Sequence, residues 1–237
     1  MNLLLLQPDD FVAPDRVRIR DRRLAHVRAV LGLAPGGELR AGLLDGALGT
    51  ATLLHLDGGV AEFTVALDSP PPPPLAVGLM LALPRPKILR RVLRAATVLG
   101  VKEIHLLNSW RVDKSYWQTP LLAPERVRAE LLLGLEQGCD TALPSVHIHR
   151  RFKPFVEDEL DAIAGARRRL VAHPRGAEPL TNAPPETPVL LALGPEGGFI
   201  PYEIDALVAC GFTPVTLGLR ILTVEVALAA ALGRLSL

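Results

Sequence analysis

Two hydrophobic patterns divide the chain, and one replaces the other near residue 70. Before that point, short apolar segments typical of β-strands alternate with glycine-containing turns; the segments are NLLLL, ELRAGLL, GTATLLHL and VAEFTVAL. Within DRRLAHVRAVLGL, apolar residues instead follow a helical spacing at Leu24, Val27, Val30 and Leu31. Several short strands within residues 1–68 predict a small barrel or a curled sheet.

Strands and helices alternate after residue 75. The pattern predicts strands at AVGLMLAL, EIHLLN, SVHIH, RLVAHP, VLLALG and PVTLG. It predicts helices at KILRRVLRAATVLG, PERVRAELLLGLEQ, DELDAIAGARRR, YEIDALVACG and TVEVALAAALGRL, with the cations of ARRRL (166–170) at a helix end. Strands rich in Val, Ile and Leu that alternate with helices predict a mostly parallel α/β sheet over residues 76–237.

A proline-rich segment, SPPPPPL, occupies residues 69–75 between the two patterns. Consecutive prolines cannot continue a sheet, and they favour a stiff, extended backbone. The segment therefore predicts a spacer between two domains. The alternative is a ligand for a proline-recognising module.

Composition and charge narrow the classes of partner. The 237 residues are 49% apolar and carry a formal net charge of +1. Such a chain can bury a sizeable core, and because its overall charge is balanced, nucleic acid would have to be attracted by a local basic patch. No apolar stretch approaches the roughly 18 residues of a membrane span. We therefore expect a cytoplasmic protein with no membrane segment.

Cysteine and histidine spacing gives no metal or redox motif. Cys139 and Cys210 lie far apart in the sequence, and we expect two free thiols in a reducing compartment. His147 and His149 share one face of a predicted strand, with no third ligand close by. We therefore expect no metal site.

A glycine-rich turn, GPEGG, follows the strand-like VLLAL and precedes a helix-like segment. It lies at the carboxyl end of a predicted strand, which is where open α/β sheets bind ligands. Its glycines, Gly194, Gly197 and Gly198, let a ligand approach the main chain. Their spacing differs from that of the phosphate-binding GxGxxG motif. The alternative is a tight turn with no ligand.

A second glycine loop lies in TLGLRILTVEVA, residues 216–227. A strand-like segment again ends in the loop, and a helix is predicted to begin near Thr223, with Glu225 in its first turn. Two such loops at neighbouring strand ends predict one pocket lined by main chain and apolar side chains. A pocket of this kind suits a flat heterocycle with polar edges better than a triphosphate.

These motifs resemble the RsmE family of SPOUT-class, S-adenosylmethionine-dependent methyltransferases, which modify uridine N3 in small-subunit (16S) ribosomal RNA. The resemblance rests on GPEGGF followed by EI, on LGxRIL and on the terminal helix with Glu225; LAHVRAVL, LLDG, AATVLGV, NSWR and LEQ extend it along nearly the whole chain. It implies a PUA-like, RNA-binding barrel over residues 1–68 and a SPOUT domain over residues 76–237. It also implies a trefoil knot over about residues 170–237, an exception to the general absence of knots.

The resemblance further implies a cofactor, partners and site residues. The cofactor is S-adenosyl-L-methionine, and the partners are ribosomal RNA or the small ribosomal subunit and a second copy of the chain, which would cover the apolar helix 225–235. Our own candidate for orienting the uracil edge or receiving its proton is Glu225; the alternative is a purely helix-stabilising role. Because Thr223 stands where the family has arginine, Arg220 or Arg111, of this chain or of its partner, would have to stabilise the deprotonated base. The cofactor-binding residues would be Ala172, His173, Leu193, Gly194, Pro195, Glu196, Gly197, Gly198, Leu217, Gly218, Ile221 and Leu222.

Two basic segments are candidates for binding RNA. Cations of PRPKILRRVLR can neutralise phosphates, and the aromatic residues of NSWRVDKSYWQ can stack on unpaired bases. The alternatives are a solvated helix face for the first segment and packing at a domain interface for the second. The candidate residues are Arg85, Lys87, Arg90, Arg91, Arg94, Trp110, Arg111 and Lys114, with Tyr116 and Trp117 beside them.

Several positions depart from the pattern that the RsmE family usually shows. Thr223 stands where the family has arginine, and Val226 where it has threonine. These losses favour an alternative function, an RNA- or ribosome-binding protein on the same scaffold with impaired methyl transfer. A small-molecule enzyme with a dinucleotide fold is a further alternative, which the missing phosphate-binding glycine motif disfavours. The other departures are Ala95, Val98, Cys139, Asp140 and Leu219.

Overall fold

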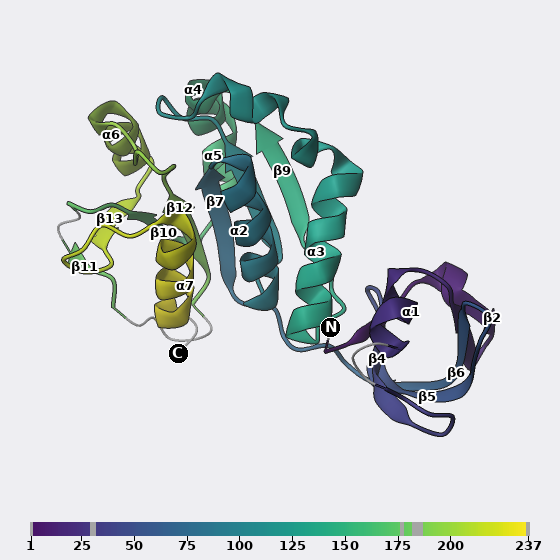
Figure 1. Cartoon of the computed structure of the whole chain (residues 1–237). Helices are drawn as coiled ribbons and strands as arrows, with labels where there is room; N and C mark the ends of the chain where they lie inside the picture. Colours follow the sequence, from purple (N-terminus) through teal and green to yellow (C-terminus); the bar gives the residue numbers. More distant parts are fainter. Residues whose placement is uncertain (1, 29–31, 176–177, 182–186, 236–237) are drawn as a thin grey trace. The chain divides into compact units, whose positions relative to one another are not determined.

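The computed structural model describes residues 2–28, 32–175, 178–181 and 187–235 (Figure 1). They form two compact units. The first comprises residues Met1–Pro73 and Leu131–Leu143, and the second comprises Pro74–Glu130 and Pro144–Leu237. The division between Pro73 and Pro74 falls inside the proline-rich segment, and the first unit also includes a stretch from the middle of the chain.

The first unit contains a six-stranded sheet with the order β1-β4-β5-β6-β3-β2. Figure 1 shows this sheet curled around a core, in which Val17, Ile19 and Phe63 are fully buried. The four strands expected from the sequence are confirmed, whereas β2 and β3 were not predicted, because prolines and charged residues surround their few apolar positions. The bounds are β1 Leu4–Leu6, β2 Phe11–Ala13, β3 Arg16–Ile19, β4 Glu38–Leu43, β5 Leu48–Asp57 and β6 Val60–Ser69.

The helix predicted in this unit is present as α1, Arg22–His26. Asp21 caps it, because its side chain accepts a hydrogen bond from the backbone N–H of Arg23. Leu24 and Val27 are buried as the periodicity predicts. Val30 and Leu31, which belong to the same prediction, lie outside the described residues.

The second unit contains a seven-stranded sheet with the order β11-β13-β10-β12-β7-β8-β9. Every pairing in it is parallel, as the alternation of strands and helices predicts. All residues of the central strands β7 and β12 are buried, which explains their uninterrupted apolar sequences. The bounds are β7 Val77–Ala82, β8 Glu103–Leu107, β9 Ser145–His149, β10 Arg168–Ala172, β11 Glu178–Pro179, β12 Val189–Leu193 and β13 Thr213–Thr216.

The helices predicted in this half of the chain are present as α2 Pro86–Val98, α3 Pro124–Gly138, α5 Leu160–Ala164, α6 Pro201–Ala209 and α7 Val224–Leu235. A further short helix, α4 Phe152–Pro154, was not predicted. A π-helical turn, Phe155–Glu159, precedes α5, and 3-10 turns occupy Lys114–Gln118 and Pro120–Leu122. Among the helices that the structure describes, none is long and apolar enough to cross a membrane.

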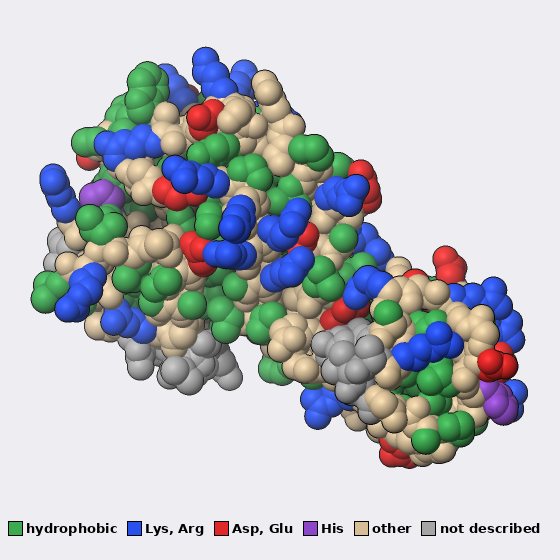
Figure 2. All heavy atoms as spheres, in the orientation of Figure 1, with side chains coloured by type: hydrophobic (Ala, Val, Ile, Leu, Met, Phe, Trp, Pro, Cys, Tyr) green, Lys and Arg blue, Asp and Glu red, His purple; other side chains and the backbone are tan. Residues whose placement is uncertain are grey.

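Helix α2 is amphipathic, which fixes its orientation on the sheet. Leu89, Val92, Leu93 and Ala96 are buried at a helical spacing. Figure 2 shows Lys and Arg side chains gathered over the opposite face of α2. Helix α7 packs beside α2 (Figure 1).

One expectation requires correction, and a second stays untested. The cations of ARRRL do not all lie at a helix end, because α5 ends at Ala164, Gly165 adopts φ 52° and β10 begins at Arg168. Arg167 still donates hydrogen bonds to carbonyl groups of the last turn, and Arg169 donates to the carbonyl group of Gly165 at 3.1 Å. Helix α7 buries Val224, Leu228, Ala231, Leu232 and Leu235 within one chain, while Val226 is 51% exposed, so cover of its remaining apolar face by a second chain stays a prediction.

Candidate functional site

Three strands of the parallel sheet end side by side and carry the loops of the predicted site. Ala172 of β10 pairs in register with Leu193 of β12 and with Val215 of β13. Because the strands are parallel, the segments that follow them leave the same edge of the sheet. These segments enclose a cavity of about 230 Å³.

Every residue that was predicted to hold a cofactor lines this cavity, including Gly194–Gly198 and four residues of the LGxRIL loop: Leu217, Gly218, Ile221 and Leu222. Arg220 also lines it. Several other lining residues were not predicted from the sequence. Each lies close in the sequence to a predicted segment, so extending those segments by a few residues would have found them. The missed residues are Pro174, Phe199, Thr216, Val224 and Ala227.

The backbone of the two loops requires glycine at particular positions. Gly198 has φ 71° and Gly218 has φ 133°, values that side-chain-bearing residues rarely adopt. At Gly194 a Cβ would lie 3.0 Å from the backbone nitrogen of Phe199. Thr216 further orders the second loop, because its hydroxyl accepts a hydrogen bond from the N–H of Gly218 at 3.3 Å.

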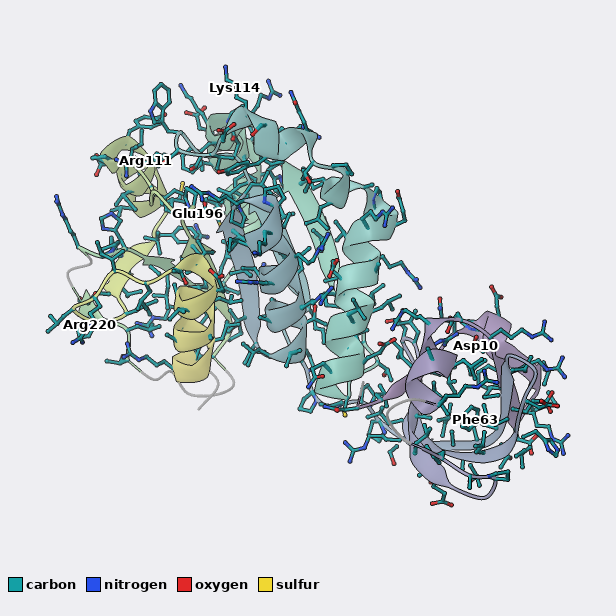
Figure 3. All side chains as sticks on the ribbon, viewed as in Figure 1. Asp10, Phe63, Arg111, Lys114, Glu196 and Arg220 are labelled. Atoms are coloured by element: carbon teal, nitrogen blue, oxygen red, sulfur yellow. The ribbon has the colours of Figure 1, made fainter. Side chains whose placement is uncertain are left out.

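Residues from the ends of β7 and β8 hold the GPEGG loop. Glu196 accepts a hydrogen bond from the backbone N–H of Arg85, with 3.0 Å between the atoms. The guanidinium of Arg111 donates to the carbonyl oxygen of Gly197. Figure 3 shows Arg111 and Glu196 over the same end of the sheet, and Arg220 pointing outward. The cavity is thus bounded by main chain whose position depends on neighbouring loops.

Glu225 does not line the cavity, although Val224 beside it does. Its carboxylate lies 3.4 Å from the guanidinium of Arg91. The pKa of Glu225 is lowered chiefly by a hydrogen bond from its own backbone N–H; burial opposes this effect, and hydrogen bonds from the side chains of Thr223 and Arg91 add to it. Two residues that were predicted to serve separately, in catalysis and in RNA binding, therefore contact each other.

The remaining basic candidates on α2 are also partly paired. Glu130 lies 3.0 Å from Arg90 and 2.5 Å from Arg94, so one carboxylate serves two cations. Arg85 donates to the hydroxyl of Tyr116 at 3.2 Å. The pairing leaves net positive charge on this face of the helix.

The two tryptophans differ in their surroundings. Trp110 is 80% exposed, which leaves its indole accessible. Trp117 instead donates to Asn108 at 2.9 Å and carries the guanidinium of Arg150 over its ring. Trp110 therefore fits base stacking, and Trp117 has a packing role. Lys114 lies in the same loop and is exposed (Figure 3).

Histidines gather on β8 and β9. His105 stacks on His147, and its Nδ1 lies 3.0 Å from Nε2 of His149. Burial lowers the pKa of both His105 and His149. In the part of the chain that the structure describes, no group of His, Cys, Asp and Glu side chains has the arrangement of a metal site. At the cavity, burial lowers the pKa of His173, with a further effect of Arg175.

Known proteins match this chain along nearly its whole length. A family model described as an RNA methyltransferase domain matches residues 71–236. Ribosomal RNA small subunit methyltransferase E of Treponema pallidum is 29% identical over 236 residues, which cover 98% of this chain and 89% of that protein. The Synechocystis protein of the same name is 30% identical over 243 residues, which cover 98% of this chain and 76% of that protein.

A solved structure shows the same fold. Ribosomal RNA small subunit methyltransferase E from Neisseria gonorrhoeae, bound to S-adenosyl methionine, matches with a TM-score of 0.75 at 23% identity, covering 98% of this chain and 95% of that chain. The resemblance seen in GPEGG and LGxRIL is thereby confirmed, and the chain belongs to the ribosomal RNA small subunit methyltransferase E (RsmE) family of RNA methyltransferases.

Proposed function

We propose that the chain transfers the methyl group of S-adenosyl-L-methionine to N3 of a uridine in 16S ribosomal RNA, in the cytoplasm. Family membership supports an RNA methyltransferase. The observation that carries the cofactor assignment is the single cavity formed by the ends of β10, β12 and β13. RNA methylation needs a methyl donor held beside an open surface, and this cavity lies at the strand ends where such a donor binds.

The lining fits the methyl donor. Leu193, Leu217 and Ile221 offer apolar surface to an adenine ring, while the bare main chain of Gly194 and Gly198 offers polar groups to its edge and to the ribose. The bound cofactor would supply a methyl group already activated on a sulfonium. The task of the protein is then to hold donor and acceptor in line and to exclude water.

The acceptor nitrogen of uracil carries a proton that must leave during transfer. Arg220 at the cavity and Arg111 above the GPEGG loop can stabilise the negative charge that develops on the base. A carboxylate with a lowered pKa is a good hydrogen-bond acceptor and a weak base. We therefore assign Glu225 to orienting the uracil edge rather than to removing its proton.

Ribosomal RNA would contact the cations of α2 and the loop after β8. One carboxylate, Glu130, is shared by two arginines, so the face retains positive charge for phosphates. The exposed indole of Trp110 would stack on an unpaired base. The candidates beside them are Arg85, Lys87, Arg91, Arg111 and Lys114.

Finer features of the fold belong to the same proposal. The curled sheet of the first unit is consistent with a PUA-like barrel, and a trefoil knot is proposed over about residues 170–237, where β13 pairs with β10 rather than with β12, the strand before it in the chain. A homodimer is supported by Leu219 and Ile221, apolar side chains that are almost fully exposed on the second loop.

Calorimetry and a methyl-transfer assay test the function. We expect S-adenosylmethionine and S-adenosylhomocysteine to bind, and ribosomal RNA from a strain that lacks the gene to accept methyl groups at uridine N3. Gly194→Val should abolish binding, since even a Cβ would lie 3.0 Å from a backbone nitrogen. Gly233→Ala is the matched control, because a Cβ at that position meets no atom within 4 Å. The proposal is overturned if neither ligand binds at millimolar concentration.

A further inference from the structure

Glu203 is a buried carboxylate for which the proposed chemistry has no direct use. It lies in the first turn of α6 and is 2% exposed. One oxygen accepts a hydrogen bond from the backbone N–H of Ile200 at 3.0 Å, and the other accepts from the backbone N–H of Trp110 at 2.7 Å. A buried carboxylate is costly unless it is hydrogen-bonded, so both contacts are needed to stabilise it.

The two partners of Glu203 belong to different parts of the site. Ile200 ends the segment that begins with GPEGG, which lines the cofactor cavity. Trp110 lies in the loop after β8 and presents the exposed indole assigned to RNA. The next residue, Arg111, donates to Gly197 in the GPEGG loop. The loop after β8 and the cofactor loop are therefore joined twice, once by a buried carboxylate and once by an exposed cation.

We propose that Glu203 is a positioning residue that couples cofactor binding to RNA binding by fixing the Trp110 loop against the GPEGG segment. This inference rests on the proposed function. A cofactor that orders the GPEGG segment also orders the loop that meets the base, and an RNA base stacked on Trp110 favours the cofactor-binding form of the segment. Such coupling must act equally in both directions.

The geometry makes a sharp distinction between Glu and Gln at this position. Glu203 uses both carboxylate oxygens as acceptors. A glutamine has one oxygen and one NH₂ group, so one of the two backbone N–H groups would face another donor. Loss of a hydrogen bond to a charged group corresponds to about a tenfold change in an equilibrium constant.

The test measures affinity for RNA with and without saturating S-adenosylhomocysteine, and affinity for S-adenosylhomocysteine alone. For the wild type, we expect the cofactor product to strengthen RNA binding. For Glu203→Gln, we expect the ratio of RNA affinities with and without S-adenosylhomocysteine to fall to near one. We also expect the affinity for S-adenosylhomocysteine itself to weaken about tenfold. Ser109→Ala is the control, because its buried hydroxyl has no hydrogen-bond partner among the described residues. It should retain the coupling of the wild type.

A second pair of variants acts from the opposite side and leaves Glu203 intact. Trp110→Ala and Trp110→Pro both remove the indole, but only proline also removes the backbone N–H that donates a hydrogen bond to Glu203. We expect both to weaken RNA binding and only Trp110→Pro to weaken binding of S-adenosylhomocysteine. Equal cofactor affinity in the two variants would overturn the inference, as would full coupling in Glu203→Gln. A wild type that binds no cofactor would overturn the proposed function instead.

Discussion

The guanidinium of Arg111 lies against Gly197 and donates a hydrogen bond to its carbonyl oxygen. A Cβ at position 197 would come within 2.9 Å of the Cδ atom of Arg111. Gly197 has no positive φ value, so the reason for glycine at this position is the close approach of the arginine side chain. The loop after β8 and the GPEGG loop can therefore pack together only because residue 197 has no Cβ.

Gly197→Ala is predicted to act by displacing Arg111. The arginine side chain is exposed and has several rotatable bonds, so it should move more readily than the loop backbone. Gly197→Ala and Arg111→Ala should each lower kcat/KM for methyl transfer by about tenfold, the size expected for one hydrogen bond to a charged group. The double variant should lose no more than either single variant, because both remove the same contact. Losses that multiply in the double variant would show that the two residues act independently.

Glu225 provides a second prediction. Because its pKa is lowered, the carboxylate is ionised at neutral pH and is a weak base. Glu225→Gln should therefore reduce kcat by about tenfold, well below the 10²–10⁴-fold effect of removing a general base. Single-turnover methyl transfer measured across pH checks this. A loss of three orders of magnitude, with disappearance of the acid limb of the pH profile, would instead identify Glu225 as the proton acceptor.

Position 223 tests whether the departures from the family pattern weaken catalysis. Thr223 precedes α7 and contributes to lowering the pKa of Glu225. Thr223→Arg would place a cation where the family usually has one, and Arg220 already lines the nearby cavity. We expect the variant to raise kcat severalfold, because a further cation can stabilise the deprotonated uracil. Thr223→Lys provides a comparison that restores charge without the planar guanidinium. An RNA-binding protein without transfer activity would give no methyl incorporation in any of the three forms.

The glycine loops could be predicted from the sequence because local motifs encode them. GPEGG and LGxRIL each follow an apolar strand, and parallel strands bring their carboxyl ends to one edge, so a shared cavity followed from the motifs alone. The continuous apolar character of β7 and β12 likewise predicted a central parallel sheet. Strands β2 and β3 are no shorter than β1, but they were missed because they contain few apolar residues and lie among prolines and charged residues, whereas β1 lies in an uninterrupted leucine run.

Contacts between distant residues could not be predicted in this way. Arg91 and Glu225 lie far apart in the chain, and only the packing of α7 on α2 brings them together. The hydrogen bond from Trp110 to Glu203 joins residues that are 93 positions apart, and no sequence motif links them. The segment ARRRL does not continue helix α5, because α5 ends just before Gly165 and Arg167 forms an ion pair with Glu103; strand β10 then begins at Arg168.

The ion pair between Arg167 and Glu103 predicts a pH-dependent stability of the second unit. A hydrogen bond from Arg167 lowers the pKa of Glu103 from 4.5 to about 2, against the effect of burial and with help from His105. Burial also lowers the pKa of His105 below 6.5. Both groups bind protons more readily in the unfolded chain, so stability should fall as pH decreases below 6.5 and again between 4.5 and about 2. Since Glu103 is partly exposed, we expect its share to be about 1–2 kcal/mol.

Tryptophan fluorescence during urea unfolding measures this effect selectively. Both tryptophans, Trp110 and Trp117, lie in the second unit together with Glu103, so their emission reports that unit and not the first. Glu103→Gln should lower the free energy of unfolding at neutral pH. It should also remove most of the decrease in stability between pH 4.5 and about 2, because glutamine does not titrate. Asp205→Asn, at an exposed position on α6, is the control and should retain the acid dependence of the wild type. If Glu103→Gln loses stability below pH 4.5 as steeply as the wild type, the dependence arises from other carboxylates and the role given to this ion pair is wrong.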